Sequence, residues 1–294
     1  MVEQTPLQRM ASDFAESRIA LAGLALLAAI LLVALLAPLI SPQNPYDLAQ
    51  LDVLDSRLPP GAQSQSEGGK TYWLGTDDQG RDMLSGIFYG LRISIGVGVA
   101  STLAALAIGL VLGLLAAYFG GWVDTLIMRI VDIQLSFPSI LIALILLALL
   151  GQGLDKIIVA LVAVQWAYYA RTVRGAALVE RRKEYMEAAA GLALSHARIV
   201  FRHLLPNCLP PLIVVATVQV AAAIALEATL SFLGLGLPIT EPSLGLLISN
   251  GFTYMLSGKY WISFYPGVAL LATIVSINLV ADQLRDVLNP RLQK

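Results

Sequence analysis

The stretch IALAGLALLAAILLVALLAPLI, residues 19–40, is 22 residues long and carries no charged side chain. A helix needs about 20 mostly apolar residues to cross the hydrocarbon core of a bilayer. The apolar run is longer than that of a signal peptide, and acidic residues precede it. We therefore predict a retained membrane-spanning helix over residues 19–40.

The rest of the chain has the same apolar character. Of its 294 residues, 57% are hydrophobic and only 13% are charged, with a mean hydropathy of +0.74. Soluble domains are about 25% charged, so this composition indicates an integral membrane protein. The net charge of −1 provides no field that would attract nucleic acid. The single cysteine, Cys208, excludes an intrachain disulfide.

Five further apolar runs follow the first one. They are continuous rather than alternating, which favours helices over the strands of a barrel. The shortest run reaches span length only if Arg171 and Arg174 lie at the membrane interface. We predict an all-α integral membrane protein with about six transmembrane helices, the further five covering residues 93–120, 133–154, 157–170, 208–226 and 260–281.

The distribution of basic residues predicts the orientation of the chain. Segment 171–206 carries seven Lys and Arg residues, whereas the longer segment 41–91 carries three. Since short cytoplasmic loops are rich in Lys and Arg, we place 171–206 in the cytoplasm and 41–91 outside. Six spans then put both termini in the cytoplasm. The expected organisation is a cytoplasmic segment 1–18, the first span 19–40, the outer segment 41–91, a five-helix core 92–283 that includes a cytoplasmic loop 175–206, and a cytoplasmic tail 284–294.

The charged stretch 184–206 interrupts the apolar core and is rich in helix-forming residues. We predict two short helices with a break between them. Lys183 can pair with Glu187, Ser195 can cap the second helix, and Pro206 can end it. The small side chains of residues 188–191 give the first helix a flat surface that another protein can approach closely. An ordinary solvated loop is the alternative.

The spacing within this stretch resembles the EAA loop of ABC importer permeases. That pattern is EAA, three residues, Gly, nine residues, an aliphatic residue, one residue, Leu-Pro. The sequence departs from it at two positions: Ala193 replaces the glycine, with Gly191 two residues earlier, and His203 replaces the aliphatic residue. The bend between the helices is therefore expected to be shifted or stiffer. The matching residues are Glu187-Ala188-Ala189, Ala193, His203 and Leu205-Pro206.

A second set of matches extends the resemblance over nearly the whole chain. The segment from Gly75 to Asp82 is similar to the GTD-x-x-GRD segment of the dipeptide/oligopeptide/nickel permease family. Residues 227–236 and the Asn-Pro-Arg at 289–291 also match that family in order. The sequence thus resembles the second-permease type of this family.

The resemblance implies a multi-pass permease subunit of the bacterial inner membrane. It implies a homologous permease as heterodimer partner, two cytoplasmic ATP-binding subunits and an extracytoplasmic binding protein. The chain is expected to contact membrane lipid and no nucleic acid. Peptides are the implied cargo. Nickel or another small peptide-like solute is an alternative, and an ion-coupled secondary transporter is an alternative from another class.

The sequence also argues against an enzyme. A phosphate-binding loop that ended at Gly69-Lys70-Thr71 would need glycine where Ser64 stands. We therefore expect no cofactor in this chain, with ATP and magnesium on partner subunits. The two histidines, His196 and His203, form no metal-binding pattern.

The candidate functional residues fall into two groups, with no catalytic and no metal-binding residue among them. The first is expected to contact an ATPase, and the second consists of charges within the spans, which are functional candidates by default. Arg129 and Asp132 are three apart and can pair on one helix face, whereas Glu227 either faces the pathway or has a structural role. The ATPase-coupling residues are Glu184, Glu187, Ala188, Ala189, Gly191, Ala193, Ser195, Leu205 and Pro206.

Overall fold

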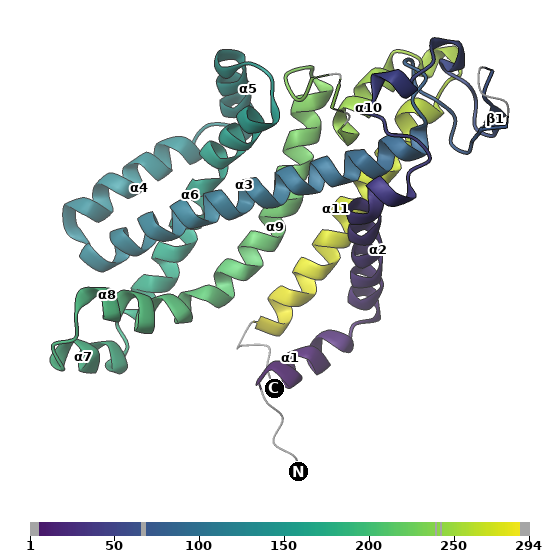
Figure 1. The fold of residues 1–294 in the computed structure, drawn as a ribbon. Helices are drawn as coiled ribbons and strands as arrows, with labels where there is room; N and C mark the ends of the chain where they lie inside the picture. The colour runs from purple at the N-terminus through teal and green to yellow at the C-terminus, as the bar shows by residue number, and fades with distance from the viewer. Residues whose placement is uncertain (1–5, 66–68, 239, 242, 289–294) are drawn as a thin grey trace.

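The computed structural model describes residues 6–65, 69–238, 240–241 and 243–288. Over these residues the protein is predominantly helical, which confirms the predicted all-α class (Figure 1). The long helices run between two ends of the molecule. The helices are α1 (Pro6–Ala15), α2 (Arg18–Ile40), α3 (Met83–Phe119), α4 (Gly121–Leu135), α5 (Ser139–Leu150), α6 (Leu154–Glu180), α7 (Glu184–Gly191), α8 (His196–Arg198), α9 (Leu205–Phe232), α10 (Leu244–Phe252) and α11 (Trp261–Leu288).

Short elements complete the described chain. Three 3-10 turns, η1 (Leu48–Gln50), η2 (Val53–Asp55) and η4 (Met255–Ser257), lie in the connections. A π-helical turn, η3 (Ile199–Leu204), joins α8 to α9. Two strands, β1 (Ala62–Gln63) and β2 (Thr71–Tyr72), pair antiparallel in the outer segment.

Four helices of the described chain are long and apolar enough to cross a membrane: α2, α3, the continuous run His196–Phe232, and α11. The bent pair α4 and α5 provides a fifth if it crosses as one unit. The remaining predicted span, 157–170, lies inside α6. That helix is about 40 Å long, sufficient to cross a bilayer, but charged residues occupy both of its ends.

The third predicted span is not one straight helix. Instead of a single helix over 133–154, α4 begins at Gly121 and meets α5 at an angle of 90°. The break falls at Phe137 and Pro138, and Pro138 takes the N-cap position of α5. Because proline disfavours helical geometry in the residue before it, α4 ends there and the chain turns.

Two glycines bring α3 and α6 into close contact. A Cβ atom on Gly109 would lie 2.5 Å from the carbonyl oxygen of Trp166, and one on Gly113 would lie 2.6 Å from that of Ala170. Neither glycine can therefore be replaced without moving a helix. The small-residue spacing of α3 thus has the packing role that such pairs have in membrane helices.

The outer segment, residues 41–82, is a folded unit with its own buried polar core. Asp55 accepts hydrogen bonds from the Ser64 hydroxyl at 2.6 Å, the Gln65 N–H at 2.6 Å and the Tyr72 hydroxyl at 2.8 Å. The Asp55 side chain is therefore satisfied although only 1% of its surface is exposed. The segment ends earlier than residue 91, since α3 already begins at Met83.

The residues from Gly75 to Asp82 form the base of this unit and are not a solvated surface. The positive φ of Gly80, +78°, lets the backbone pass Asp52, whose carbonyl oxygen would lie 2.1 Å from an added Cβ. Asp82 caps α3 by accepting the Ser85 N–H at 2.9 Å.

Candidate functional site

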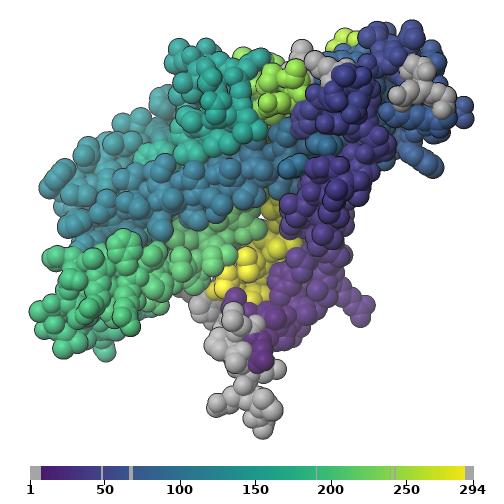
Figure 2. Space-filling view, viewed as in Figure 1, coloured from purple at the N-terminus to yellow at the C-terminus, as the bar shows by residue number. Residues whose placement is uncertain are grey.

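Residues 184–206, here called the coupling segment after the ATPase contact predicted for them, lie at one end of the molecule. Figure 1 shows α7 and α8 at the same end as α1, whereas α10 and the outer segment lie at the opposite end. In the space-filling view the coupling segment projects from the body of the bundle (Figure 2). It is therefore accessible to another protein.

The first helix of the coupling segment, α7, has an exposed face and a packed face. Glu184, Glu187, Ala188 and Gly191 are exposed. Ala189 is only 5% exposed and packs in a cluster with residues of α3, α6 and α9. The prediction that Ala189 belongs to an uncovered flat surface is therefore wrong, because this position points into the protein's own core.

The bend after α7 lies at the position where the EAA pattern has glycine. Ala193 has a φ of +52°, whereas Gly191 is the last residue of the helix and does not have positive φ. The Leu194 N–H donates to the Ala189 carbonyl at 3.4 Å, as in a Schellman-type helix end. The bend is therefore not shifted to Gly191, and an alanine occupies a conformation that favours glycine.

The second half of the segment continues directly into α9. Ser195 is extended and precedes α8, but its side chain makes no capping hydrogen bond. Pro206 does not end the helix, contrary to the prediction, and Leu205 lies next to it in the first turn of α9. In a regular helix the ring of Pro206 would clash with the carbonyl four residues earlier. The wider π turn Ile199–Leu204, just before Pro206, relieves that clash.

A chain of hydrogen bonds ties the two ends of the coupling segment together. The Tyr185 hydroxyl donates to Glu180 at 2.7 Å, and the Asn207 side-chain amide donates to the Tyr185 hydroxyl at 3.1 Å. Lys183 pairs with Glu180 at 2.6 Å rather than with the predicted Glu187. The hydrogen-bonded residues Glu180, Tyr185 and Asn207 are called the clasp below. Sequence reasoning missed the clasp, since its residues lie up to 27 positions apart and on three different elements.

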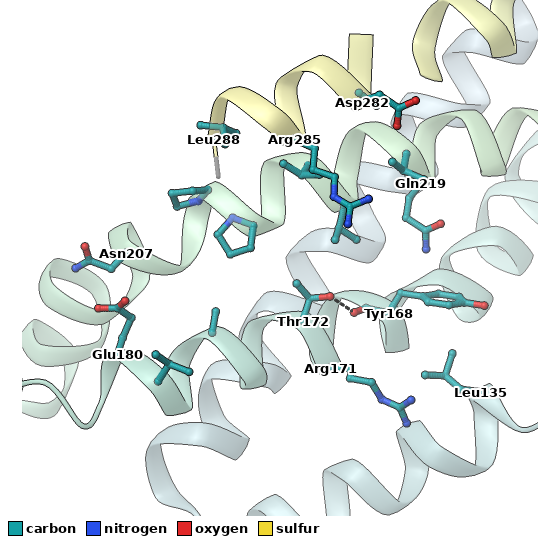
Figure 3. A pocket seen from close by; sticks show the side chains of 18 residues that line it. Leu135, Tyr168, Arg171, Thr172, Glu180, Asn207, Gln219, Asp282, Arg285 and Leu288 are labelled. Atoms are coloured by element: carbon teal, nitrogen blue, oxygen red, sulfur yellow. Dashed lines mark hydrogen bonds between the residues drawn. The ribbon is translucent and has the colours of Figure 1, made fainter. Parts of the chain in front are cut away.

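Glu180 and Asn207 also line a cleft of about 1140 Å³ between α6, α9 and α11 (Figure 3). Its wall is mixed, with aliphatic side chains from α9 and polar groups from all three helices. Arg171, Asp282 and Arg285 provide charges of both signs. The sequence analysis predicted none of these cleft residues as pathway residues. The only signal that it offered was the presence of two charged residues, Asp282 and Arg285, near the end of the last apolar run.

The charges predicted within the spans have other partners than expected. Asp132 forms an ion pair with Arg171 of α6, so the predicted pair with Arg129 is wrong. Arg129 itself is exposed on α4. A second ion pair joins Asp124 and Arg174, in which two guanidinium nitrogens contact the two carboxylate oxygens. These two ion pairs hold α4 against α6. Their partners are 39 and 50 positions apart, so the periodicity of a single helix could not predict them.

Glu227 is enclosed by the protein and does not line the cleft. Its side chain is 0% exposed. One carboxylate oxygen accepts the Ser94 hydroxyl of α3 at 2.9 Å, and the other accepts the Ser231 hydroxyl at 2.8 Å. Of the two predicted roles, this geometry favours the structural one, because both oxygens have partners within the chain.

Comparison with known families agrees with this architecture. Residues 109–294 match the family described as "Binding-protein-dependent transport system inner membrane component". The chain belongs to this family. Residues 5–60 of this permease also match the N-terminal transmembrane domain of oligopeptide transport permease C. The resemblance inferred from the motifs is thereby confirmed, and a secondary transporter gains no support.

Relatives of this permease extend over its whole length. It is 37% identical over 292 residues to the dipeptide transport system permease protein DppC of Haemophilus influenzae, covering 99% of this chain and 97% of the relative. It is 36% identical over 294 residues to the di/tripeptide permease DppC of Pseudomonas aeruginosa, covering 100% and 95%. It is 37% identical to the oligopeptide permease OppC of Bacillus subtilis over 281 residues, covering 96% and 88%.

A solved structure shares the fold. A chain of the inward-facing MetNI methionine ABC transporter superposes with a TM-score of 0.57 and 23% identity. The match covers 70% of this permease and 98% of that chain. At this identity the likeness concerns the architecture of the membrane helices and not the cargo.

Proposed function

We propose that this permease is one of two membrane subunits of an ATP-driven importer for di- or oligopeptides. The printed names of its relatives support the peptide cargo. A homologous permease would complete the pathway, and a substrate-binding protein would deliver the peptide to the outer side. ATP and magnesium would bind on two cytoplasmic ATPase subunits.

The main support for this proposal is that the coupling segment has one exposed side and one side packed against the bundle. Its exposed side presents Glu184, Glu187 and Ala188, whereas its inner side packs Met186 and Ala189 into the bundle. A partner that pushes on such a segment displaces the core beneath it, because packed interiors transmit displacement. An ordinary solvated loop would lack this buried underside.

The proposed orientation follows from charge and from the fold. The basic stretch 171–206, which includes the coupling segment, would lie in the cytoplasm. Figure 1 places α1 at the same end as the coupling segment, which agrees with cytoplasmic termini. The outer segment, with its own core, would then present a preformed surface to the binding protein or to the partner permease.

The cleft between α6, α9 and α11 would form half of the pathway. Glu180 and Asn207 belong both to its wall and to the clasp of the coupling segment. Closure of the ATPase dimer would move the segment and, through this clasp, change the relative position of α6 and α9. That is a two-state element biased by ATP bound on another subunit.

Crosslinking tests the proposed contact. Ala188→Cys, in the assembled transporter, should react through a short bifunctional reagent with an ATPase subunit. Leu256→Cys serves as a matched control, because Leu256 is fully exposed and lies in η4, shortly after α10, which is at the opposite end of the molecule from α7 (Figure 1). The native Cys208 is buried and remains in both variants. Equal crosslinking from residues 188 and 256, or none from 188, would refute the coupling role.

A transport assay tests the cargo separately. The purified complex in vesicles should take up a labelled di- or oligopeptide in the presence of ATP and the binding protein. Uptake of nickel ions but not of peptides would refute the peptide assignment and leave the coupling role intact. The two experiments therefore fail independently.

A further inference from the structure

The C-terminal end of α3 contacts the coupling segment, although more than 60 residues separate them in the chain. The Tyr118 hydroxyl is hydrogen-bonded to Nδ1 of His196, which begins α8. Their rings pack edge to face with centroids 5.6 Å apart. The second half of the coupling segment is thus attached to a helix that is not one of its chain neighbours.

Arg181, directly after α6, joins the same point. Its Nη1 donates to the Ala117 carbonyl at 2.9 Å, and its guanidinium carbon lies 6.0 Å from the centre of the Tyr118 ring. The last carbonyls of a helix have no intrahelical donor, and a cation there is favourable. Arg181 therefore fixes the end of α3 to the end of α6, with Tyr118 between Arg181 and His196.

An apolar cluster lies beneath these polar contacts. Leu114 and Ala117 of α3 belong to one buried cluster with Met186, Ala189 and Ile199 of the coupling segment. Both halves of the coupling segment therefore share a core with the end of α3. A displacement of the segment that left α3 unmoved would have to open this core, and opening it would expose apolar surface.

We propose that Tyr118, Arg181 and His196 form a clamp through which movement of the coupling segment reaches α3. The inference rests on the proposed coupling function and adds α3 as a third responding helix beside α6 and α9. The three side chains would be positioning residues, since they hold α3 against the segment and do not themselves contact ATP or cargo.

The far end of α3 shows where such a movement would arrive. The helix runs unbroken for 37 residues from Met83 to Phe119. At its start the Asp82 N–H donates to the Gln43 side chain at 2.7 Å, and the Gln43 N–H donates to the Ser85 hydroxyl at 3.1 Å. These bonds join α3 to the outer segment, so the clamp would link the two ends of the molecule.

Hydrogen exchange of the assembled transporter tests the clamp. A non-hydrolysable ATP analogue should change exchange in residues 112–119 as well as in 205–212. Arg181→Ala and Tyr118→Phe should reduce the change in 112–119 about fivefold, as expected for losing one net hydrogen bond, and preserve it in 205–212. Uptake should fall relative to ATP hydrolysis in both variants.

Matched variants separate the clamp from a general structural effect. Arg182→Ala removes the same charge one residue later, and Tyr260→Phe removes the hydroxyl of an exposed tyrosine directly before α11. Both should respond like the wild type. The exchanged pair Tyr118→His with His196→Tyr should restore part of the response.

Three results would overturn the clamp. One is a wild-type change in 205–212 without any in 112–119. Another is an undiminished change in 112–119 in both clamp variants. If neither segment responds to the analogue, the coupling function itself fails and the inference fails with it.

Discussion

Ser94 on α3 donates a 2.9 Å hydrogen bond to Glu227 on α9, 133 positions later in the chain. With the Ser231 hydroxyl at 2.8 Å on the other oxygen, the carboxylate joins two long helices inside the bundle. A buried polar group of this kind is destabilising unless all its partners are present. The relationship makes Glu227 a structural link between α3 and α9.

Glu227→Ala should therefore destabilise the protein much more than Glu227→Gln. The alanine leaves a cavity and two unpaired buried hydroxyls, for a loss of about 3 kcal/mol. The glutamine retains the volume and one acceptor, and a serine hydroxyl can rotate to accept its amide, for a loss of about 1 kcal/mol. Thermal unfolding in detergent measures the difference.

Transport per assembled complex is the accompanying control. It should be near normal in Glu227→Gln, since this residue does not line the cleft. A large loss of transport in a fully stable Glu227→Gln protein would reinstate a pathway role.

Ala193→Gly should stabilise the bend of the coupling segment, because alanine at a φ of +52° is strained by about 1 kcal/mol. The greater freedom of glycine in the unfolded chain offsets part of this gain, which leaves about 0.5 kcal/mol. Slower proteolytic cleavage at 191–195 is the expected readout.

Gly191→Ala provides the matched comparison. A Cβ atom there meets nothing within 4 Å, and the residue is helical, so alanine should also be favourable by about 0.5 kcal/mol. Faster cleavage of Ala193→Gly than of wild type would show that the bend adopts another conformation.

Ala188→Trp and Ala189→Trp should fail in different ways. At the exposed position 188, tryptophan should block an ATPase subunit while the permease still inserts and remains stable. At position 189, which is 5% exposed, it overpacks the cluster beneath α7 and should cost about 2 kcal/mol or more. Yield, thermal stability and ATP-driven uptake distinguish the two, and equal stability losses would contradict the assigned faces of α7.

The two ion pairs between α4 and α6 should contribute unequally. Asp124→Ala should cost about 1 kcal/mol, because both side chains of the Asp124–Arg174 pair are at most 32% exposed and the contact is bidentate. Asp132→Ala should cost about 0.3 kcal/mol, because the side chains of its pair are 52% and 60% exposed. Thermal unfolding of the single and double variants tests the order, and the reverse order would show that exposure does not decide their contributions.

Asp77 should contribute most to the stability of the outer segment at acidic pH. Burial raises the pKa of this carboxyl from 3.8 to about 6, although Arg81 opposes the shift. The folded segment therefore binds the Asp77 proton more tightly than the unfolded chain does. The resulting stabilisation is complete below pH 3.8 and is lost as the pH rises through about 6.

Hydrogen-exchange protection factors in residues 70–82, compared between Asp77→Asn and the wild type, isolate this contribution. The wild type should lose protection between the two pKa values relative to the variant. The same pH profile in both proteins would contradict the assignment.

Four of the six predicted spans lie on helices that are long and apolar enough to cross a bilayer, because apolar length is a local property of the sequence. The predicted span 133–154 is instead divided by a 90° bend, and 157–170 lies within α6. The sequence also predicts the break between two helical stretches within 184–206, since the signals for helix start and end are local. It misses which side of α7 is buried, because four consecutive small residues give no amphipathic pattern. Only the tertiary packing of Ala189 against the bundle settles that.

Long-range partners are the other part that sequence reasoning cannot supply. Asp132 has a possible partner three residues away, yet the crossing of α4 and α6 brings Arg171 to it from 39 positions further on. The break at Pro138 was readable in principle from the proline, but not its angle of 90°.

The length of α3 has a consequence for the lipid around the protein. The 27 residues between Arg92 and Gly120 carry no charge and extend about 40 Å, against a hydrocarbon thickness of about 30 Å. Such a helix fits the bilayer when inclined by roughly 40°, and Figure 1 shows α3 strongly inclined to α2. Because Gly109 and Gly113 hold α3 against α6, the helix is not free to change its angle alone, and a bilayer of another thickness has to adapt to the apolar length that the helix presents.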